Sequence, residues 1–421
     1  MPKTADQAFL AQLFDTAVQA ADPKVALASH LPKPPKGRTV VIGAGKGAAQ
    51  MAAAFEELWD APLEGVVVTR YGYGATTRTI RVLEASHPVP VEAGLEATRA
   101  LFEAVQGLTE NDLVVALICG GGSALLPAPP DKLDFEDEQA LNRALLASGA
   151  PISVMNAIRK QVSQIKGGRL AAAAFPARVC SLIVSDVPGD DPAQVASGPT
   201  VPDASTRADA LSLIAAHRIE LPAKVSAYLA ANAGEAPSPD DPVFANNTVK
   251  VIASAALSLE AAAKAANAAG LSAVILSDAI EGEANDVGKV HAAIARECWL
   301  RNRPFATPVV ILSGGETTVT IRDAGGRGGR NSEFLLSFAG GIEGLDITAL
   351  AADTDGIDGS EDNAGAFANG DSWARMRAKG LDPAAVLGNH DAWAAFNATN
   401  DLFVPGPTGT NVNDFRAILI R

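Results

Sequence analysis

The chain has 421 residues, more than one hydrophobic core usually serves, so its length predicts two domains. Its net charge of −14, with 34 Lys and Arg against 48 Asp and Glu, argues against nucleic-acid or anionic-membrane partners, because both need a broad basic face. Three cysteines without a C-x-x-C spacing indicate a reduced, cytoplasmic protein, and no apolar stretch is long enough to cross a bilayer.

The first half of the chain alternates apolar runs with helical segments. Strands are expected over 39–42, 65–69, 80–84, 113–119 and 179–185, and helices over 9–21, 48–59, 93–106, 136–148, 153–165 and 206–216. Near-continuous apolar strands separated by helices predict an α/β fold. Its sheet is expected to be Rossmann-like, doubly wound, mostly parallel and covered on both faces.

A polar, proline-rich segment at 232–242 is the expected boundary, which places the domains at 1–236 and 243–421. In the smaller second domain, strands are expected over 249–252, 272–276, 308–312, 317–321, 347–351 and 415–420, and helices over 254–269, 284–300, 331–340, 371–379 and 391–397. Only four residues separate 308–312 from 317–321, so these two strands are expected to form a hairpin in a mixed sheet. A ligand-binding cleft is expected between the domains.

The loop Gly43-Ala44-Gly45-Lys46-Gly47 follows the first expected strand. Its glycines let the backbone approach a phosphate, and Lys46 adds a cationic charge, so Gly45 and Lys46 are predicted to bind an anion. The loop is neither a dinucleotide fingerprint, since Ala48 replaces the third glycine, nor a P-loop, because the lysine comes too early. A tight turn with a solvated lysine is the alternative interpretation.

A second glycine loop, Cys119-Gly120-Gly121-Gly122-Ser123, follows the strand at 113–119. Three glycines leave no side chain between a ligand and the amide groups, and Ser123 adds a hydroxyl. Ligands bind at the carboxyl ends of strands in open α/β sheets. Gly120, Gly121, Gly122 and Ser123 are therefore predicted to contact substrate or phosphate, although a flexible connection would have a similar composition.

Carboxylates follow the strand at 179–185, in the run Ser185-Asp186-Val187-Pro188-Gly189-Asp190-Asp191. Such groups can activate a hydroxyl or bind magnesium together with phosphate oxygens. Asp186 leaves the strand directly and is the stronger candidate for both roles, with Asp190 as a second metal ligand. The alternative is turn chemistry, for which Asp and Gly are common.

Two arginines precede the helix expected at 331–340, in Gly326-Arg327-Gly328-Gly329-Arg330-Asn331. An arginine beside the positive end of a helix suits a carboxylate or phosphate. Arg330 is predicted to be the functional cation, with Arg327 and Asn331 as further substrate or phosphate contacts. One of the two arginines is expected to be an ordinary solvated loop residue.

These loops together resemble the glycerate 2-kinase family, whose C-terminal region is called the MOFRL domain and whose members are often labelled hydroxypyruvate reductase. The resemblance runs nearly end to end and rests on ordered motifs: Val41-Ile42-Gly43-Ala44-Gly45-Lys46, Ser86-His87-Pro88-Val89-Pro90, Cys119-Gly120-Gly121-Gly122-Ser123, Gln164-Ile165-Lys166-Gly167-Gly168-Arg169, Ser185-Asp186-Val187, Ala196-Ser197-Gly198-Pro199-Thr200, Gly314-Gly315-Glu316-Thr317, Gly328-Gly329-Arg330-Asn331, Thr354-Asp355-Gly356 and the run from Gly406 to Asp414.

The resemblance implies ATP- and Mg²⁺-dependent phosphorylation of D-glycerate at its 2-hydroxyl. It assigns Lys46 and Arg330 to the anionic substrate and the transferring phosphate, and Asp186 to the hydroxyl proton or the metal. Cys119 stands where the family suggests a serine.

Two other functions stay open from the sequence. An NAD(P)H-dependent hydroxypyruvate reductase is one, because Arg70 after the second strand could suit a 2′-phosphate. A non-catalytic sugar-acid sensor is the other, although it would not need Lys46, Asp186 and Arg330 together. The oligomeric state is also open, with a homodimer as one option.

Overall fold

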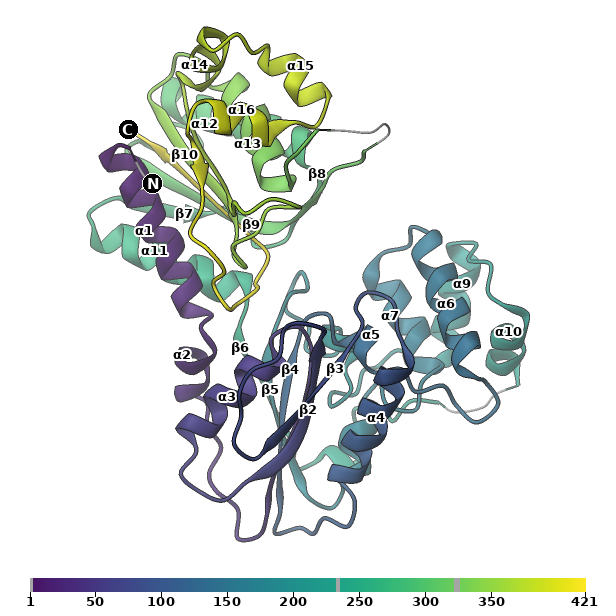
Figure 1. Ribbon diagram of the computed structural model, residues 1–421. Helices are drawn as coiled ribbons and strands as arrows, with labels where there is room; N and C mark the ends of the chain where they lie inside the picture. The colour runs from purple at the N-terminus through teal and green to yellow at the C-terminus, as the bar shows by residue number, and fades with distance from the viewer. Residues whose placement is uncertain (1–2, 232–234, 322–325) are drawn as a thin grey trace. The chain divides into compact units, whose positions relative to one another are not determined.

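The structure is a computed structural model that describes residues 3–231, 235–321 and 326–421. It contains two compact units (Figure 1). The N-terminal unit is Pro23–Ile252, and the C-terminal unit combines Met1–Asp22 with Ala253–Arg421. These limits differ from the expected ranges 1–236 and 243–421, because helix α1 (Ala5–Ala20) packs in the C-terminal unit. Part of the expected boundary, 232–234, lies outside the described residues.

The sheet of the N-terminal unit has, within the described residues, six strands in the order β3-β2-β1-β4-β5-β6. Their bounds are β1 (Thr39–Ala44), β2 (Glu64–Arg70), β3 (Ile80–Ala85), β4 (Leu113–Cys119), β5 (Arg178–Val184) and β6 (Thr248–Ala253). The pairs β3–β2, β2–β1, β1–β4 and β4–β5 are parallel. Every residue of β1 and β4 is buried, as expected for strands covered on both faces. The predicted doubly wound sheet is confirmed.

One strand belongs to a different sheet than the sequence suggests. Residues 249–252 are expected in the second domain because they follow the proline-rich segment. They form part of β6, which instead completes the first sheet at the side of β5. The sequence of a short apolar strand does not show which sheet the strand will join.

Two groups of helices in the N-terminal unit pack around separate apolar clusters. Helices α4 (Glu92–Ala104) and α8 (Arg169–Ala173) pack on the sheet face that carries Val40, Ile42 and Ala44. A second apolar cluster forms among α6 (Phe135–Ala147), α7 (Ile152–Gln161), α9 (Arg207–Ala216) and α10 (Ala223–Ala230). The remaining helical segments are α2 (Pro23–Ala28), α3 (Ala48–Leu58), α5 (Gly122–Leu125), η1 (Val195–Ser197) and η2 (Pro242–Phe244).

The sheet of the C-terminal unit is mixed, as predicted. Its order in the described residues is β12-β11-β10-β13-β9-β7, with β8 also paired to β9. The bounds are β7 (Ser272–Ile275), β8 (Ile280–Glu283), β9 (Val309–Thr318), β10 (Ile347–Asp353), β11 (Gly365–Asn369), β12 (Leu402–Phe403) and β13 (Asp414–Ile420). Strand β9 is parallel to β7 and β8 and antiparallel to β13.

The hairpin expected around Ser313 to Glu316 is wrong, because β9 runs without interruption from Val309 to Thr318. Gly315 has φ +122 and lies so close to β8 that a Cβ there would be 2.2 Å from the Ile280 carbonyl oxygen. The glycines therefore let two strands approach closely instead of reversing the chain.

Helices cover both faces of this second sheet (Figure 1). On β9, Val310 and Leu312 face the cluster that contains α1 and α11 (Ala255–Ala268). Val309 and Ile311 alternate with them and face the opposite cluster. That cluster includes α12 (Ala284–Arg301), α13 (Arg330–Gly341), α14 (Ser372–Ala378) and α16 (Ala392–Ala398), with α15 (Pro383–Gly388) beside them.

Candidate active site

One candidate site is built at one edge of the N-terminal sheet. In the parallel register, Ala44 of β1 lies opposite Ile118 of β4, and Cys119 lies opposite Val184 of β5. The loops that follow these three strands therefore emerge together. The Lys46 amide donates to the Gly120 carbonyl at 2.8 Å, which ties the first glycine loop to the second.

Two glycines bring Lys46 and Asp186 to this edge. A Cβ at Gly120 would lie 1.7 Å from Asp186 Oδ2, so the Asp186 carboxylate rests directly on the glycine backbone. Gly121 has φ +79, and a Cβ there would lie 2.9 Å from Lys46 Cγ. The structure thus gathers Lys46, Gly120, Gly121 and Asp186 from three separate loops.

This contact predicts that Gly120→Ala displaces the Asp186 carboxylate. We expect kcat to fall about a hundred-fold, since a shift near 1 Å in a reacting group has effects of that size. Gly47→Ala is the matched control, because its Cβ would meet only Cys119 Sγ at 3.7 Å and its φ is −101. Kinetics of both variants at saturating substrate test the prediction, and equal losses would contradict it.

Cys119 forms a hydrogen bond that holds the loop containing Lys46. Its Sγ accepts a hydrogen bond from the Gly47 amide at 3.1 Å, and the side chain is buried. Burial raises the pKa of the thiol to about 12, so it remains protonated at neutral pH. Cys119 is therefore a hydrogen-bonding support and not a nucleophile.

His87 also lies at this site, although no single residue pattern in the sequence indicates a role for it. A Cβ at Gly121 would lie 3.4 Å from His87 Cε1. Burial, followed by the charges of Lys46 and Arg70, lowers the pKa of His87 to about 4. The imidazole is neutral at pH 7 and adds no positive charge. Only the Ser86-His87-Pro88 motif of the family resemblance could have pointed to it.

Asp190 is the second residue that the sequence predicts to bind a metal. It lies in a turn after β5 with φ +52, and the described residues contain no group of three or more His, Cys, Asp or Glu side chains placed to hold an ion. A protein-only metal cage is therefore not formed there. Mg²⁺ commonly uses one or two carboxylates together with phosphate oxygens, and Asp186 fits that mode.

A second candidate site lies in the C-terminal unit around Arg330, at the start of α13. Its three nitrogens each meet a different carboxylate: Nε donates to Asp414 at 2.7 Å, Nη2 to Asp353 at 2.7 Å and Nη1 to Glu316 at 3.1 Å. Burial alone would lower the pKa of Arg330, but the three carboxylates outweigh it and hold the pKa above its ordinary value. The guanidinium is thus a fixed cation.

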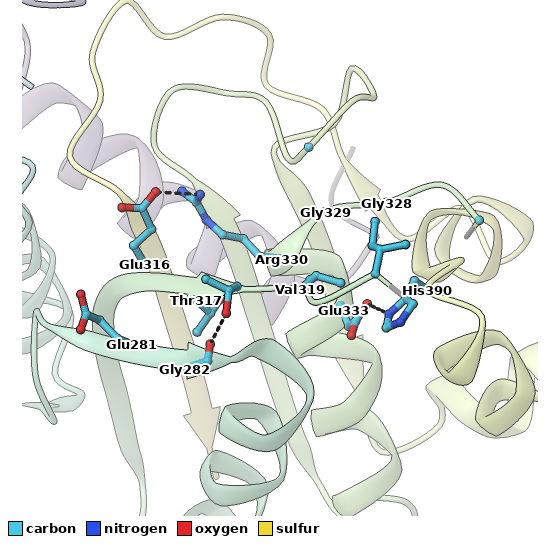
Figure 2. A pocket seen from close by; sticks show the side chains of 14 residues that line it. Glu281, Gly282, Glu316, Thr317, Val319, Gly328, Gly329, Arg330, Glu333 and His390 are labelled. Atoms are coloured by element: carbon cyan, nitrogen blue, oxygen red, sulfur yellow. Dashed lines mark hydrogen bonds and ion pairs between the residues drawn. The ribbon is translucent and has the colours of Figure 1, made fainter. Parts of the chain in front are cut away.

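A cavity of about 660 Å³ lies beside Arg330 (Figure 2). Arg330 and Glu316 line it at one end, and Glu333 and His390 line it further along. His390 Nδ1 lies 2.9 Å from Glu333 Oε2, and burial raises the pKa of Glu333. This pair is not predictable from the sequence, because the two residues lie 57 positions apart in the chain.

The amides at the start of α13 bind a carboxylate of the protein itself. The amides of Asn331 and Ser332 donate to Asp358 at 2.9 and 2.8 Å. The Asn331 side chain is fully buried and donates to Asp414 at 2.8 Å. Asn331 therefore holds the Arg330 network in place and does not reach the cavity.

Arg327 lies outside the Arg330 network. Its guanidinium carbon is 3.8 Å from the centre of the Trp393 ring, and its nearest ion-pair distance is 3.9 Å, to Glu361. The side chain is exposed, at 56%. Of the two arginines, only Arg330 is held rigidly.

Family models match most of this chain. The model described as "Domain of unknown function (DUF4147)" matches residues 9–230, and the MOFRL family model matches 309–414. A protein of Agrobacterium vitis named "Putative hydroxypyruvate reductase" is 53% identical, with 98% of this chain and 94% of that protein covered.

Other relatives carry kinase names. The glycerate 2-kinase of Pyrococcus horikoshii is 40% identical, with 90% of this chain and 86% of that protein covered. The crystal structure of glycerate kinase from Thermotoga maritima has a TM-score of 0.90 at 36% identity, with 98% of this chain and 99% of that chain covered. Likeness of this extent confirms the resemblance seen in the motifs. The chain belongs to the glycerate 2-kinase family.

Proposed function

We propose that this protein transfers the γ-phosphate of ATP to the 2-hydroxyl of D-glycerate, forming 2-phosphoglycerate and ADP. The observation that carries the proposal is the placement of Lys46 and Asp186 against adjacent glycines at the carboxyl ends of parallel strands. Phosphoryl transfer needs mainly alignment and charge neutralisation, and this edge supplies a cation, a carboxylate and glycine backbone without side chains.

In this mechanism, Asp186 accepts the proton of the attacking hydroxyl or helps to hold the metal. Lys46 neutralises charge on the transferring phosphate. Gly45, Gly120, Gly121 and Gly122 let the phosphates approach the backbone. Mg²⁺, when bound, would offset phosphate charge, and Asp186 is the residue best placed to contact it.

We assign Arg330 to the binding of an anionic substrate group. Two of its carboxylate partners are buried, with side-chain exposures of 8% for Asp353 and 0% for Asp414, whereas Glu316 is 52% exposed. The contact with Glu316 is the one that an incoming anion could replace. The other two contacts would keep the guanidinium oriented meanwhile.

The alternative is an NAD(P)H-dependent hydroxypyruvate reductase, the activity named for the A. vitis relative. Against it, β2 ends in Arg70 instead of the acidic residue that binds the ribose in a dinucleotide fold, and the Arg70 guanidinium stacks on Tyr73 at 3.5 Å. A paired assay separates the two functions: ATP with D-glycerate in one reaction, NADH or NADPH with hydroxypyruvate in the other. Turnover only in the second reaction would overturn the kinase proposal.

The kinase proposal predicts a specific product. Enolase accepts 2-phosphoglycerate but not 3-phosphoglycerate, so product made from D-glycerate and ATP should be consumed by enolase without added phosphoglycerate mutase. The measurement is phosphoenolpyruvate formation with and without mutase. A strict requirement for mutase would show phosphorylation at the 3-hydroxyl instead.

We also propose that the protein acts in the cytoplasm on small-molecule substrates. Its three cysteines are buried and free, which suits a reducing compartment. No helix in the described part of the chain has the length and apolar character needed to span a membrane.

A further inference from the structure

The hydroxyl of Ser123, beside the second glycine loop, is the end of a buried polar chain. Ser123 Oγ lies 2.7 Å from Ser197 Oγ, and Ser197 Oγ lies 3.1 Å from Asn156 Oδ1. Ser197 and Asn156 are buried, at 0% and 2% exposure, whereas Ser123 is only half-buried. Of these three residues, Ser123 is therefore the one that solvent or a ligand can reach most easily.

The chemistry of the groups fixes the direction of each hydrogen bond in this polar network. Arg159 Nη1 lies 3.1 Å from one end of the Asn156 amide, and the Gln194 carbonyl oxygen lies 3.2 Å from the other. Arginine can only donate and a carbonyl can only accept, so the oxygen of the amide must face Arg159. That same oxygen is the Ser197 partner, and Ser197 must therefore donate its single proton to it.

This assignment fixes the role of Ser123. Because the Ser197 proton is already used, the 2.7 Å contact requires Ser123 to donate its own proton to Ser197. The Ser123 oxygen then offers only lone pairs to a ligand. A phosphate or carboxylate oxygen would be repelled by such a group, whereas a hydroxyl would be bound as a donor.

The backbone around Ser197 holds this arrangement. Ala196 and Ser197 have φ values of +53 and +61, which side-chain-bearing residues seldom adopt. A Cβ at Gly122 would lie 2.6 Å from the Ala196 Cβ, so the glycine loop rests directly on this segment. Such conformations persist where surrounding contacts fix them, and they are frequent at functional sites.

We propose that Ser123 accepts a hydrogen bond from the 3-hydroxyl of glycerate and so selects against 2-hydroxy acids that lack this group. This inference rests on the proposed function. The reacting 2-hydroxyl needs a base, which the carboxylate of Asp186 can be, whereas the serine alcohol is not basic. Ser123 is therefore suited to the hydroxyl that keeps its proton.

The test compares D-glycerate with D-lactate, which has the same carboxylate and 2-hydroxyl but no 3-hydroxyl. Dissociation constants for both are measured by calorimetry on the wild-type protein and on Ser123→Ala, Ser197→Ala and Ser181→Ala. Ser181 is the matched control, because its hydroxyl is also buried against a second hydroxyl, that of Thr200 at 2.8 Å.

The wild type should prefer glycerate by about ten-fold, the size of one good hydrogen bond. Ser123→Ala should abolish the preference by weakening glycerate alone. Ser197→Ala should reduce it, because Ser123 is then free to turn its proton outward. Ser181→Ala should keep it.

Equal weakening of both ligands by Ser123→Ala, or an unchanged preference, would overturn the inference. A rise in the Mg²⁺ concentration needed for half-maximal activity, with the preference kept, would also overturn it and make Ser123 a metal ligand. If Ser123→Ala does not fold, Ser197→Ala decides. Glycerate that binds with the expected preference but is not phosphorylated would count against the proposed function alone.

Discussion

Lys46→Ala should lower kcat by about two to three orders of magnitude, the scale of losing one charge contact to the transition state. Within the described residues, Lys46 takes part in no ion pair, and its backbone contacts do not depend on the side chain. The melting temperature should therefore stay almost unchanged. Steady-state kinetics with ATP and D-glycerate, together with a thermal melt, measure both quantities.

The control for this prediction is Lys24→Ala, which removes a lysine of the same unit from an exposed pair with Glu57. Exposed pairs contribute little to stability, and Lys24 lies on α2, away from the glycine loops. Its kcat should match the wild type. Near-normal turnover in Lys46→Ala would return this lysine to the role of a solvated loop residue.

Arg330→Lys should lower kcat/KM for D-glycerate about ten-fold or more, because lysine keeps the charge but loses the planar fork. It should also destabilise the C-terminal unit by about 2–4 kcal/mol, since a lysine cannot serve the carboxylates of Asp353 and Asp414 with the same geometry. The measurements are kcat/KM at saturating magnesium-ATP, well below the melting temperature, and unfolding by denaturant.

Arg327→Lys is the comparison. This side chain is exposed and stacks on Trp393, so a lysine in its place should change both kcat/KM and stability only mildly. A larger loss in Arg327→Lys than in Arg330→Lys would move the anion-binding role to Arg327.

The candidate site of the N-terminal unit can be predicted from the sequence because parallel strands bring their carboxyl ends together. Apolar runs locate β1, β4 and β5, and the polar residues after them must meet at one edge. Strand order along the chain is therefore enough to group Lys46, Gly120 and Asp186. It is not enough to include His87, because the loop after β3 has no glycine run or carboxylate to mark it.

The candidate site of the C-terminal unit is harder to predict, because the partners of Arg330 come from distant segments. Arg330 is recognisable from its own loop, but Asp353 and Asp414 become its neighbours only when β10 pairs with β13. Likewise, Asp358 accepts hydrogen bonds from the first amides of α13, although it lies 27 positions after Asn331 in the chain. Local sequence describes donors, but tertiary pairing decides which acceptors they meet.

The place of α1 has a consequence for how this protein is made. Its residues Leu10, Leu13 and Phe14 share a core with Leu259 and Phe415, so the N-terminal unit is inserted between the first helix of the C-terminal unit and the rest of it. During synthesis α1 is made before the N-terminal unit, whereas the strands that it packs against are made after that unit. The inserted unit is one continuous segment and can fold before the remaining strands of the C-terminal unit are made. A fragment cut to begin at residue 253 would therefore lack a helix of its core, despite containing every strand of its sheet.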